Sequence, residues 1–191
     1  MGKEICKSGL RLERLIENFL FYARLEMVAT DADSVNALRS AKIAAPANTA
    51  RLVAVSQAKT AGRLPDLALE LSDAPLAMAE EYFKKIVAEL VQNAFKFSPA
   101  NSPVRVSLTN NSPDTVTLTV ADRGRGLSSE HIAKIGAYMQ FDRKMHEQQG
   151  LGLGLSICKR LTELHGGTLA IQSDPSNGTT VTIKLPKIAA H

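Results

Sequence analysis

The chain reads Gln149-Gly150-Leu151-Gly152-Leu153-Gly154-Leu155-Ser156 directly before an amphipathic helical pattern. Glycine lacks a Cβ atom, so alternate glycines let another group approach the backbone closely and allow positive φ angles. The free N–H groups and the dipole at the start of a helix attract an anion. The stretch therefore predicts a loop that holds phosphate, and the alternative is a loop whose glycines are merely flexible.

The composition narrows the possible classes of protein. Of 191 residues, 45% are hydrophobic and 22% are charged, which is enough for one core of ordinary size. No apolar run is long enough to span a membrane, and no signal-peptide pattern opens the chain, so we expect no membrane segment. Cys6 and Cys158 lie in helical patterns, which favours a reducing, cytoplasmic location. The net charge of +4 is spread along the chain, and we expect an anionic small ligand rather than nucleic acid.

The first thirty residues differ from the rest, because apolar residues recur there at helical spacings. They include Ile5, Leu12, Leu15, Ile16, Phe19 and Leu20. Because its apolar face is wide, we expect this helix to pack on a partner helix, either from a second copy of the chain or from a segment outside this sequence. The alternative is that it caps the core of the following domain. We predict a partial dimerisation helix at 1–30, a connector at 31–47 and a second domain at 48–187.

From residue 48 the pattern mixes helices with alternating strands. It predicts a helix that Asn48 or Thr49 caps and that ends near Gly62, and a long helix from Met78 to Phe97. Strands are expected at 66–71, 104–108, 116–120, 168–173 and 179–185, the last four as two hairpins. Helices on one face of a mixed, mostly antiparallel sheet make an α+β fold, a two-layer sandwich.

The long helix carries the first group of polar side chains that could bind a ligand. Glu89 and Asn93 are four residues apart on one face, and Lys96 follows one turn later. Carboxylate and amide oxygens suit Mg²⁺, which usually takes one or two protein ligands and completes its shell with phosphate oxygens and water. Lys96 can neutralise phosphate as a point charge. The alternative is an exposed, solvated helix face.

A second group follows the strand that ends at Ala121, where the chain reads Asp122-Arg123-Gly124-Arg125-Gly126. A carboxylate at a strand end can accept a hydrogen bond from an exocyclic amine such as adenine N6, and a buried acceptor rejects ligands that lack the amine. The alternative is an ordinary Asp-x-Gly turn. Thr179 can add a hydroxyl to the same pocket. Phe97 either stacks on a flat ring or is a core side chain.

These three stretches, in this order, resemble the ATP-binding catalytic domain of sensor histidine kinases. That domain belongs to the GHKL ATPase superfamily, with the Bergerat-type fold, shared with type II topoisomerases, mismatch-repair proteins and heat-shock chaperones. The N box resembles 89–97, the first glycine box 122–126 and the second 150–155. Gly178-Thr179 and the strand to Pro186 resemble the closing strand of the family. The resemblance covers about residues 48–186.

The resemblance implies a role for each matched position. Asn93 would ligate Mg²⁺ with Glu89 in its inner or outer shell, and Lys96 would contact phosphate. Asp122 would bind the adenine amine with support from Thr179, and Phe97 would line the base pocket. The remaining nucleotide-binding positions would be Gly124, Gly126, Gly150, Gly152, Gly154 and Leu155. Residues 127–149 would form a lid with Phe141 and Arg143, although Tyr138 to Arg143 departs from the usual Phe-x-Pro-Phe pattern.

The opening helix also resembles part of this family. Leu12 to Glu26 is similar to the second helix of the dimerisation and phosphoacceptor hairpin. The family's phosphorylated histidine precedes that helix, whereas the histidines here, at 131, 146, 165 and 191, all follow it. The resemblance implies a protein histidine kinase domain that binds Mg·ATP and phosphorylates a separately supplied hairpin but not itself. The phosphoryl group would pass to a response regulator, and the parent protein would be cytoplasmic or membrane-associated.

Three alternatives remain beside this interpretation. A Rossmann domain would place its glycines as G-x-G-x-x-G after a strand that opens a βαβ unit, whereas here they follow a polar segment and precede a terminal hairpin. A related GHKL ATPase or serine kinase would act on an anti-sigma-type partner and would lack the opening helix. A catalytically silent module would bind nucleotide, including ADP, without transfer.

Overall fold

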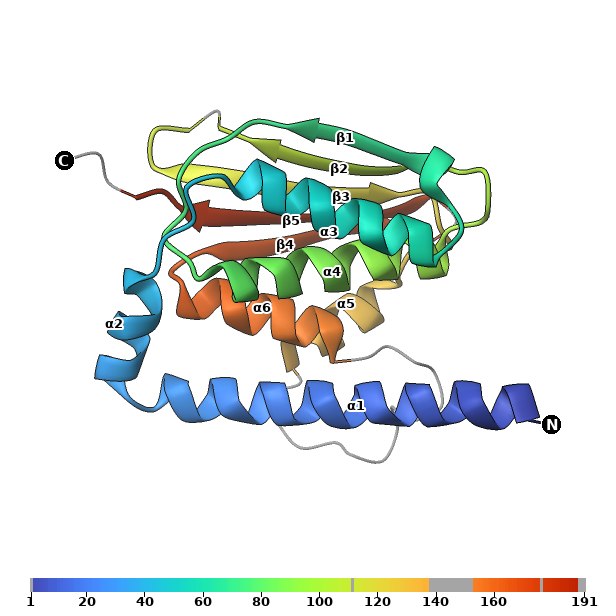
Figure 1. The fold of residues 1–191 in the computed structure, drawn as a ribbon, viewed down its shortest axis with the longest axis horizontal. Coiled ribbons are helices and arrows are strands. Elements are labelled where there is room, and N and C mark those ends of the chain that lie inside the picture. The colour runs from blue at the N-terminus through green and yellow to red at the C-terminus, as the bar shows by residue number, and fades with distance from the viewer. Residues whose placement is uncertain (1, 111, 138–152, 176, 189–191) are drawn as a thin grey trace.

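The computed structural model describes residues 2–110, 112–137, 153–175 and 177–188. Its elements are α1 (Gly2–Ala29), α2 (Ala32–Ser40), α3 (Pro46–Thr60), the 3-10 turn η1 (Leu64–Asp66), β1 (Leu67–Leu71), α4 (Glu80–Phe97), β2 (Val104–Thr109), β3 (Thr115–Asp122), α5 (Ser129–Ala137), α6 (Gly154–Leu164), β4 (Thr168–Asp174) and β5 (Gly178–Pro186). The helices cover one face of the sheet, as Figure 1 shows, and this confirms the predicted α+β fold.

The sheet has five strands in the order β1-β2-β3-β5-β4. β1 pairs with β2 in parallel, and the other pairs are antiparallel. Alternation of apolar and polar residues sets the register, since a slip by one residue would turn the apolar side chains of β3 to the wrong face. The register places Asp122, at the end of β3, opposite Thr179, at the start of β5. Two of the predicted site residues are therefore neighbours across the sheet.

The core lies between the sheet and the layer made by α3, α4 and α6 (Figure 1). On α4, Phe83, Ile86, Val87 and Leu90 recur at spacings of three and four and are buried. α3 begins earlier than the caps Asn48 and Thr49 predicted, because Pro46 has the fixed φ that suits the first helical position. α4 therefore packs on the core with one side and turns its Glu89 side away from the sheet.

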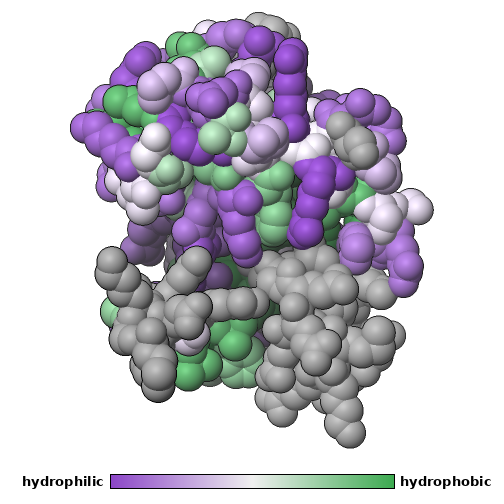
Figure 2. Space-filling view, turned by 90° about the vertical axis from the view of Figure 1, so that its right-hand side faces the viewer, coloured by the Kyte–Doolittle hydropathy of each residue, from purple (hydrophilic) through white to green (hydrophobic). Residues whose placement is uncertain are grey.

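α1 lies beside the helix layer on the side away from the sheet (Figure 1). Its Leu25 is buried, and Phe21 and Tyr22 pack against the core. Other apolar residues of α1 are exposed, namely Leu12, Leu15, Ile16, Phe19, Leu20 and Met27. Figure 2 shows a mostly hydrophilic upper part and hydrophobic residues gathered lower down, on the side where α1 lies. α1 thus contacts the helix layer and also presents an apolar surface.

The predicted connector contains α2, whose first turn is capped by the carboxylate of Asp31 on the backbone N–H of Ser34. Arg39 of α2 donates to the carbonyl oxygen of Leu164 at 2.7 Å, which ties this segment to the end of α6. Within the described residues, no helix is long and apolar enough to cross a membrane.

Candidate functional site

Glu89 lies in the middle of α4 with its side chain only 5% exposed. Arg14 Nη2 donates to Oε2 at 2.9 Å, and Lys85 Nζ lies 2.9 Å from Oε1. Each carboxylate oxygen therefore faces a cation, which offsets the cost of burying the charge. The sequence spacing is enough to suggest the pair of Lys85 with Glu89, because the two residues are four apart on the same helix. The pair of Arg14 with Glu89 cannot be read from spacing, because Arg14 belongs to α1.

Gly154 opens α6 directly against Glu89. A Cβ atom at Gly154 would lie 2.3 Å from Glu89 Oε2, so only glycine fits without displacing the carboxylate. The last glycine of the second glycine box is thus in contact with the carboxylate of the N box. Leu155, the next residue, is half-buried and packs against the core.

Asn93 and Lys96 continue the same helix toward its C-terminal end. Asn93 is half-buried one turn after Glu89, and Lys96 is exposed. Lys96 Nζ lies 4.8 Å from the ring centroid of Phe97, and the guanidinium carbon of Arg125 lies 4.7 Å from it. Two cations thus contact one half-buried aromatic ring. Arg125 stands in the predicted glycine box, but sequence analysis assigned it no role.

The turn after β3 packs against the last residue of α4. Asp122 Oδ1 accepts a hydrogen bond from the backbone N–H of Gly124 at 2.7 Å. A Cβ atom at Gly124 would lie 2.5 Å from the carbonyl oxygen of Phe97. Gly126 has φ +70°, and a Cβ atom there would lie 2.2 Å from the carbonyl oxygen of Asp174. At both positions the neighbouring backbone is too close for any residue but glycine. The close approach of Gly124 to Phe97 places Asp122 near Phe97.

Burial raises the pKa of the Asp122 carboxyl, and hydrogen bonds from the backbone N–H groups of Gly124 and Thr179 oppose that effect. The hydroxyl of Thr179 lies 2.9 Å from Ser173 Oγ, which also accepts from the N–H of Leu127 at 2.8 Å. Ser173 therefore joins β4, β5 and the segment after the glycine turn. This serine was not predicted from the sequence, since an isolated serine in a strand carries no signal of its own.

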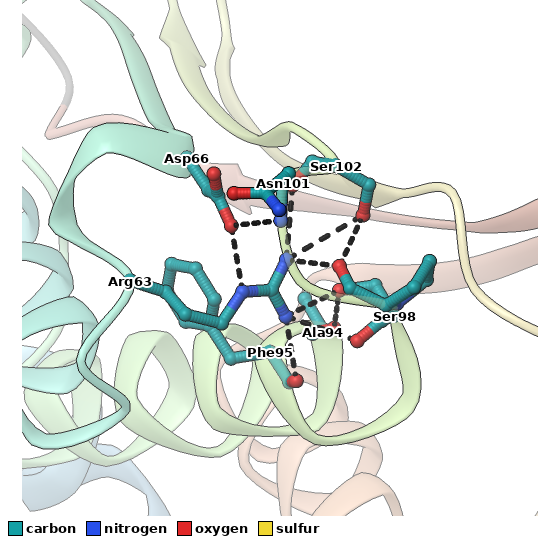
Figure 3. Close-up of polar contacts among 8 residues, drawn as sticks. Arg63, Asp66, Ala94, Phe95, Ser98, Asn101 and Ser102 are labelled. Atoms are coloured by element: carbon teal, nitrogen blue, oxygen red, sulfur yellow. Dashed lines mark hydrogen bonds and ion pairs between the residues drawn. The ribbon is translucent and has the colours of Figure 1, made fainter.

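Arg63 fixes the C-terminal end of α4, as Figure 3 shows. Its guanidinium donates to the carbonyl oxygens of Phe95, Ser98, Pro99 and Ser102 at 2.6 to 3.0 Å. Its Nε also pairs with Asp66 at 2.7 Å. The carbonyl of Phe95 is one that the helix end leaves without an intrahelical partner, and the other three belong to the C-cap and the loop that follows α4. We call Arg63 and these acceptors the Arg63 cluster, which no sequence motif predicted.

Other predicted positions lie outside the described residues. These are Gly150, Gly152, Phe141, Arg143 and His146, with all of the expected lid beyond residue 137. Within the described residues, no group of three or more His, Cys, Asp or Glu side chains gathers as a metal site. Among the residues that the structure describes, Glu89 and Asn93 offer one carboxylate and one amide, which is a donor set for an ion held mainly by phosphate and water.

Comparison with known proteins identifies the family. The family described as histidine kinase-, DNA gyrase B- and HSP90-like ATPases matches residues 78–189. Histidine protein kinase DivJ of Caulobacter vibrioides is 38% identical over 108 residues, which are 56% of this chain and 18% of DivJ. Sensor protein IrlS of Burkholderia pseudomallei is 30% identical over 195 residues, covering 98% of this chain and 40% of IrlS.

Solved structures show the same fold. The Acinetobacter baumannii histidine kinase AdeS matches with a TM-score of 0.70 at 17% identity, over 98% of this chain and 84% of that one. Full-length ShkA in complex with AMPPNP matches with a TM-score of 0.71 at 23% identity, over 97% of this chain and 38% of ShkA. The N-terminal helices are included in both matches.

Proposed function

Because the chain belongs to the histidine kinase-, DNA gyrase B- and HSP90-like ATPase family, as the catalytic domain of a sensor histidine kinase, we propose the following activity. The domain binds Mg·ATP along α4 and transfers the γ-phosphoryl group to a histidine on a separate dimerisation hairpin. The phosphoryl group then passes to a response-regulator receiver domain in the cytoplasm. ADP leaves as the product.

One observation carries this proposal. A single helix touches both glycine segments, since Glu89 meets Gly154 and the carbonyl of Phe97 meets Gly124. The two contacts lie eight residues apart on α4, a helical distance of about 12 Å. That length suits a nucleotide that lies along the helix, with its base near Phe97 and its phosphates near Glu89. In phosphoryl transfer a protein contributes mainly position and charge neutralisation.

At the base end, Asp122 is the proposed acceptor for the adenine amine. Its desolvated carboxylate is held in place by the N–H of Gly124, and Thr179 is held by Ser173. Phe97 offers an aromatic face for the base, with Arg125 and Lys96 beside it. A purine without the exocyclic amine would leave the Asp122 acceptor unpaired, which costs affinity.

At the phosphate end, Asn93 is the proposed protein ligand of Mg²⁺. The residues fit this ion, because the half-buried amide lies one helical turn from the Glu89 carboxylate, which itself lies against Gly154. Both Glu89 oxygens already face cations, so Glu89 is better suited to the outer shell of the ion than to direct ligation. Mg²⁺ would neutralise phosphate oxygens. Lys96 would contact a phosphate oxygen from the exposed side of α4.

The test adds a hairpin fragment bearing an acceptor histidine and γ-labelled ATP to this chain. Label on the fragment histidine, and none on the chain itself, supports the kinase assignment. ATP binding without any labelled fragment would identify the silent nucleotide-binding module instead. A fragment whose histidine is replaced by alanine controls for transfer to other side chains.

A further inference from the structure

Arg125 lies over the aromatic ring that the proposed function assigns to the base. Its guanidinium carbon is 4.7 Å from the ring centroid of Phe97. Aromatic groups that pack on each other hold their centroids about 4.5 to 7 Å apart. A guanidinium is flat and weakly hydrated, so it stacks on a ring much as an aromatic group does. Arg125 therefore stands at the distance from Phe97 that a stacked base would take.

The backbone of Arg125 is held in place, whereas its side chain is exposed. Its N–H donates to the carbonyl oxygen of Phe97 at 3.4 Å. The next residue, Gly126, packs so closely that a Cβ atom there would lie 2.2 Å from the carbonyl oxygen of Asp174. The guanidinium can thus leave the ring without any change in the backbone of the turn.

The same turn carries Asp122, the proposed acceptor for the adenine amine. A Cβ atom at Gly124 would lie 2.7 Å from Asp122 Oδ1 and 2.5 Å from the carbonyl oxygen of Phe97. The two residues proposed to bind the base therefore meet at one glycine, and Arg125 directly follows that glycine. A base that donates to Asp122 and stacks on Phe97 would have to enter beside Arg125.

We propose that Arg125 sets the nucleotide affinity of the site, because its guanidinium must leave Phe97 before an adenine base can stack there. Arg125 is thus a competitor for the base that is built into the chain. Lys96 Nζ also lies over the ring, at 4.8 Å, but an ammonium is compact and strongly hydrated and does not take the place of a flat base. This inference rests on the proposed function, because it deepens the base end of the same site.

The size of the effect follows from the exposure of Arg125. A cation–π contact at an exposed site corresponds to about a two- to fivefold change in an equilibrium constant. Removing the guanidinium also removes a positive charge, which by itself weakens the binding of an anionic nucleotide. Arg123 is exposed in the same turn and carries the same charge, so a change there is the matched control.

The experiment measures the affinity for Mg·ADP by calorimetry in the unchanged chain, in Arg125→Ala and in Arg123→Ala. ADP contains the base and has no γ-phosphoryl group to lose during the titration. We expect Arg125→Ala to bind Mg·ADP about two- to fivefold more tightly than Arg123→Ala does. Equal affinities of the two variants, or weaker binding by Arg125→Ala, would overturn the proposal.

A second measurement follows the Arg125 side chain by nuclear magnetic resonance. Without nucleotide, the ring current of Phe97 should shift the Nε–H proton of Arg125 upfield, and Phe97→Leu should abolish that shift. Saturating Mg·ADP should return the resonance toward the position of an exposed arginine. An unshifted resonance in the free chain, or a shifted one that Mg·ADP leaves in place, would overturn the proposal.

Failure of the unchanged chain to bind Mg·ADP would refute the proposed function. The resonance of Arg125 in the free chain would then still show whether its guanidinium stacks on Phe97, so the two failures are distinguishable.

Discussion

The two halves of α4 are anchored in different ways. At the C-terminal end, Arg63 binds backbone carbonyls, and its side chain is 12% exposed. In the other half, side chains of α1 pair with side chains of α4, and Arg14 is 41% exposed. The mostly buried guanidinium of Arg63 has few ways to exchange its carbonyl partners for water, whereas the half-exposed pair of Arg14 can exchange with water more easily. The difference indicates a fixed C-terminal half, which is the proposed base end, and an adjustable half, which is the proposed phosphate end.

The largest effect is expected at the fixed end. Arg63→Ala would leave the carbonyls of Phe95 and Ser98 without donors and should lower the free energy of unfolding by about 3 kcal/mol. Urea denaturation measures the loss. Arg51→Ala, on the exposed side of α3, is the control. A loss for Arg63→Ala no greater than for Arg51→Ala would mean that the Arg63 cluster does not anchor α4.

The next effect concerns the contact between α4 and the glycine turn. Gly124→Ala would force a Cβ atom to within 2.5 Å of the Phe97 carbonyl, so the turn and Asp122 must move. We expect about 2 kcal/mol of destabilisation. Gly62→Ala is the control, because a Cβ atom there meets nothing within 4 Å and only its φ of +67°, a strain that Gly124 lacks, disfavours alanine. Equal losses in thermal unfolding would show that the close approach at Gly124 is unimportant.

The free energy of unfolding is expected to depend on pH through His165, which follows α6 and contacts the ring of Tyr82. Nδ1 of His165 lies 2.7 Å from the carbonyl oxygen of Leu161, and Nε2 finds no hydrogen-bond partner among the described residues. Burial lowers the pKa of His165 below its ordinary 6.5; the Leu161 bond opposes this, and the Arg39 charge adds to it.

Below pH 6.5 the unfolded chain then binds more protons at this histidine than the folded one. The stabilising contribution of His165 is therefore complete above pH 6.5 and lost as the pH falls. Denaturation at a series of pH values should show a steeper acid loss for the unchanged chain than for His165→Gln. Parallel curves would contradict the buried neutral imidazole.

The smallest effect on stability is expected at Arg14. Arg14→Gln removes a half-exposed partner while Lys85 still compensates Glu89, so the free energy of unfolding should fall by at most about 1 kcal/mol. The same urea titrations as for Arg63→Ala give the comparison. A loss at Arg14 as large as that at Arg63 would erase the difference between the two halves of α4.

The sequence predicted the fold well because its elements are set by local patterns. The alternation of apolar and polar residues in 104–108 and 116–120 predicted the hairpin of β2 and β3. The helical spacing of apolar residues in 80–97 predicted which side of α4 is buried. Motif order also identified the glycine segments that meet α4 at its middle and at its C-terminal end. The roles of Asn93, Asp122 and Thr179 stay predictions.

The contacts that could not be predicted from the sequence join segments that lie far apart in the chain. Arg14 reaches Glu89 across 75 residues, and Arg63 reaches Ser102 across 39. Neither arginine stands in a motif, and only the packing of the helices decides which carboxylate or carbonyl it meets. Ser173 was missed for the same reason, since its partners come from two separate segments, the one after the glycine turn and the start of β5.

Titration of Mg·ATP into the unchanged chain and into Asn93→Ala by calorimetry tests the central claim, that α4 carries a nucleotide site. We predict binding by the unchanged chain and a loss of at least about tenfold in affinity for Asn93→Ala, because the amide oxygen would hold Mg²⁺ at the phosphates. Gln92→Ala, the neighbouring amide, should bind as the unchanged chain does. Equal affinity for Asn93→Ala and the unchanged chain, with both folded, would mean that Asn93 does not hold a nucleotide-bound ion on α4.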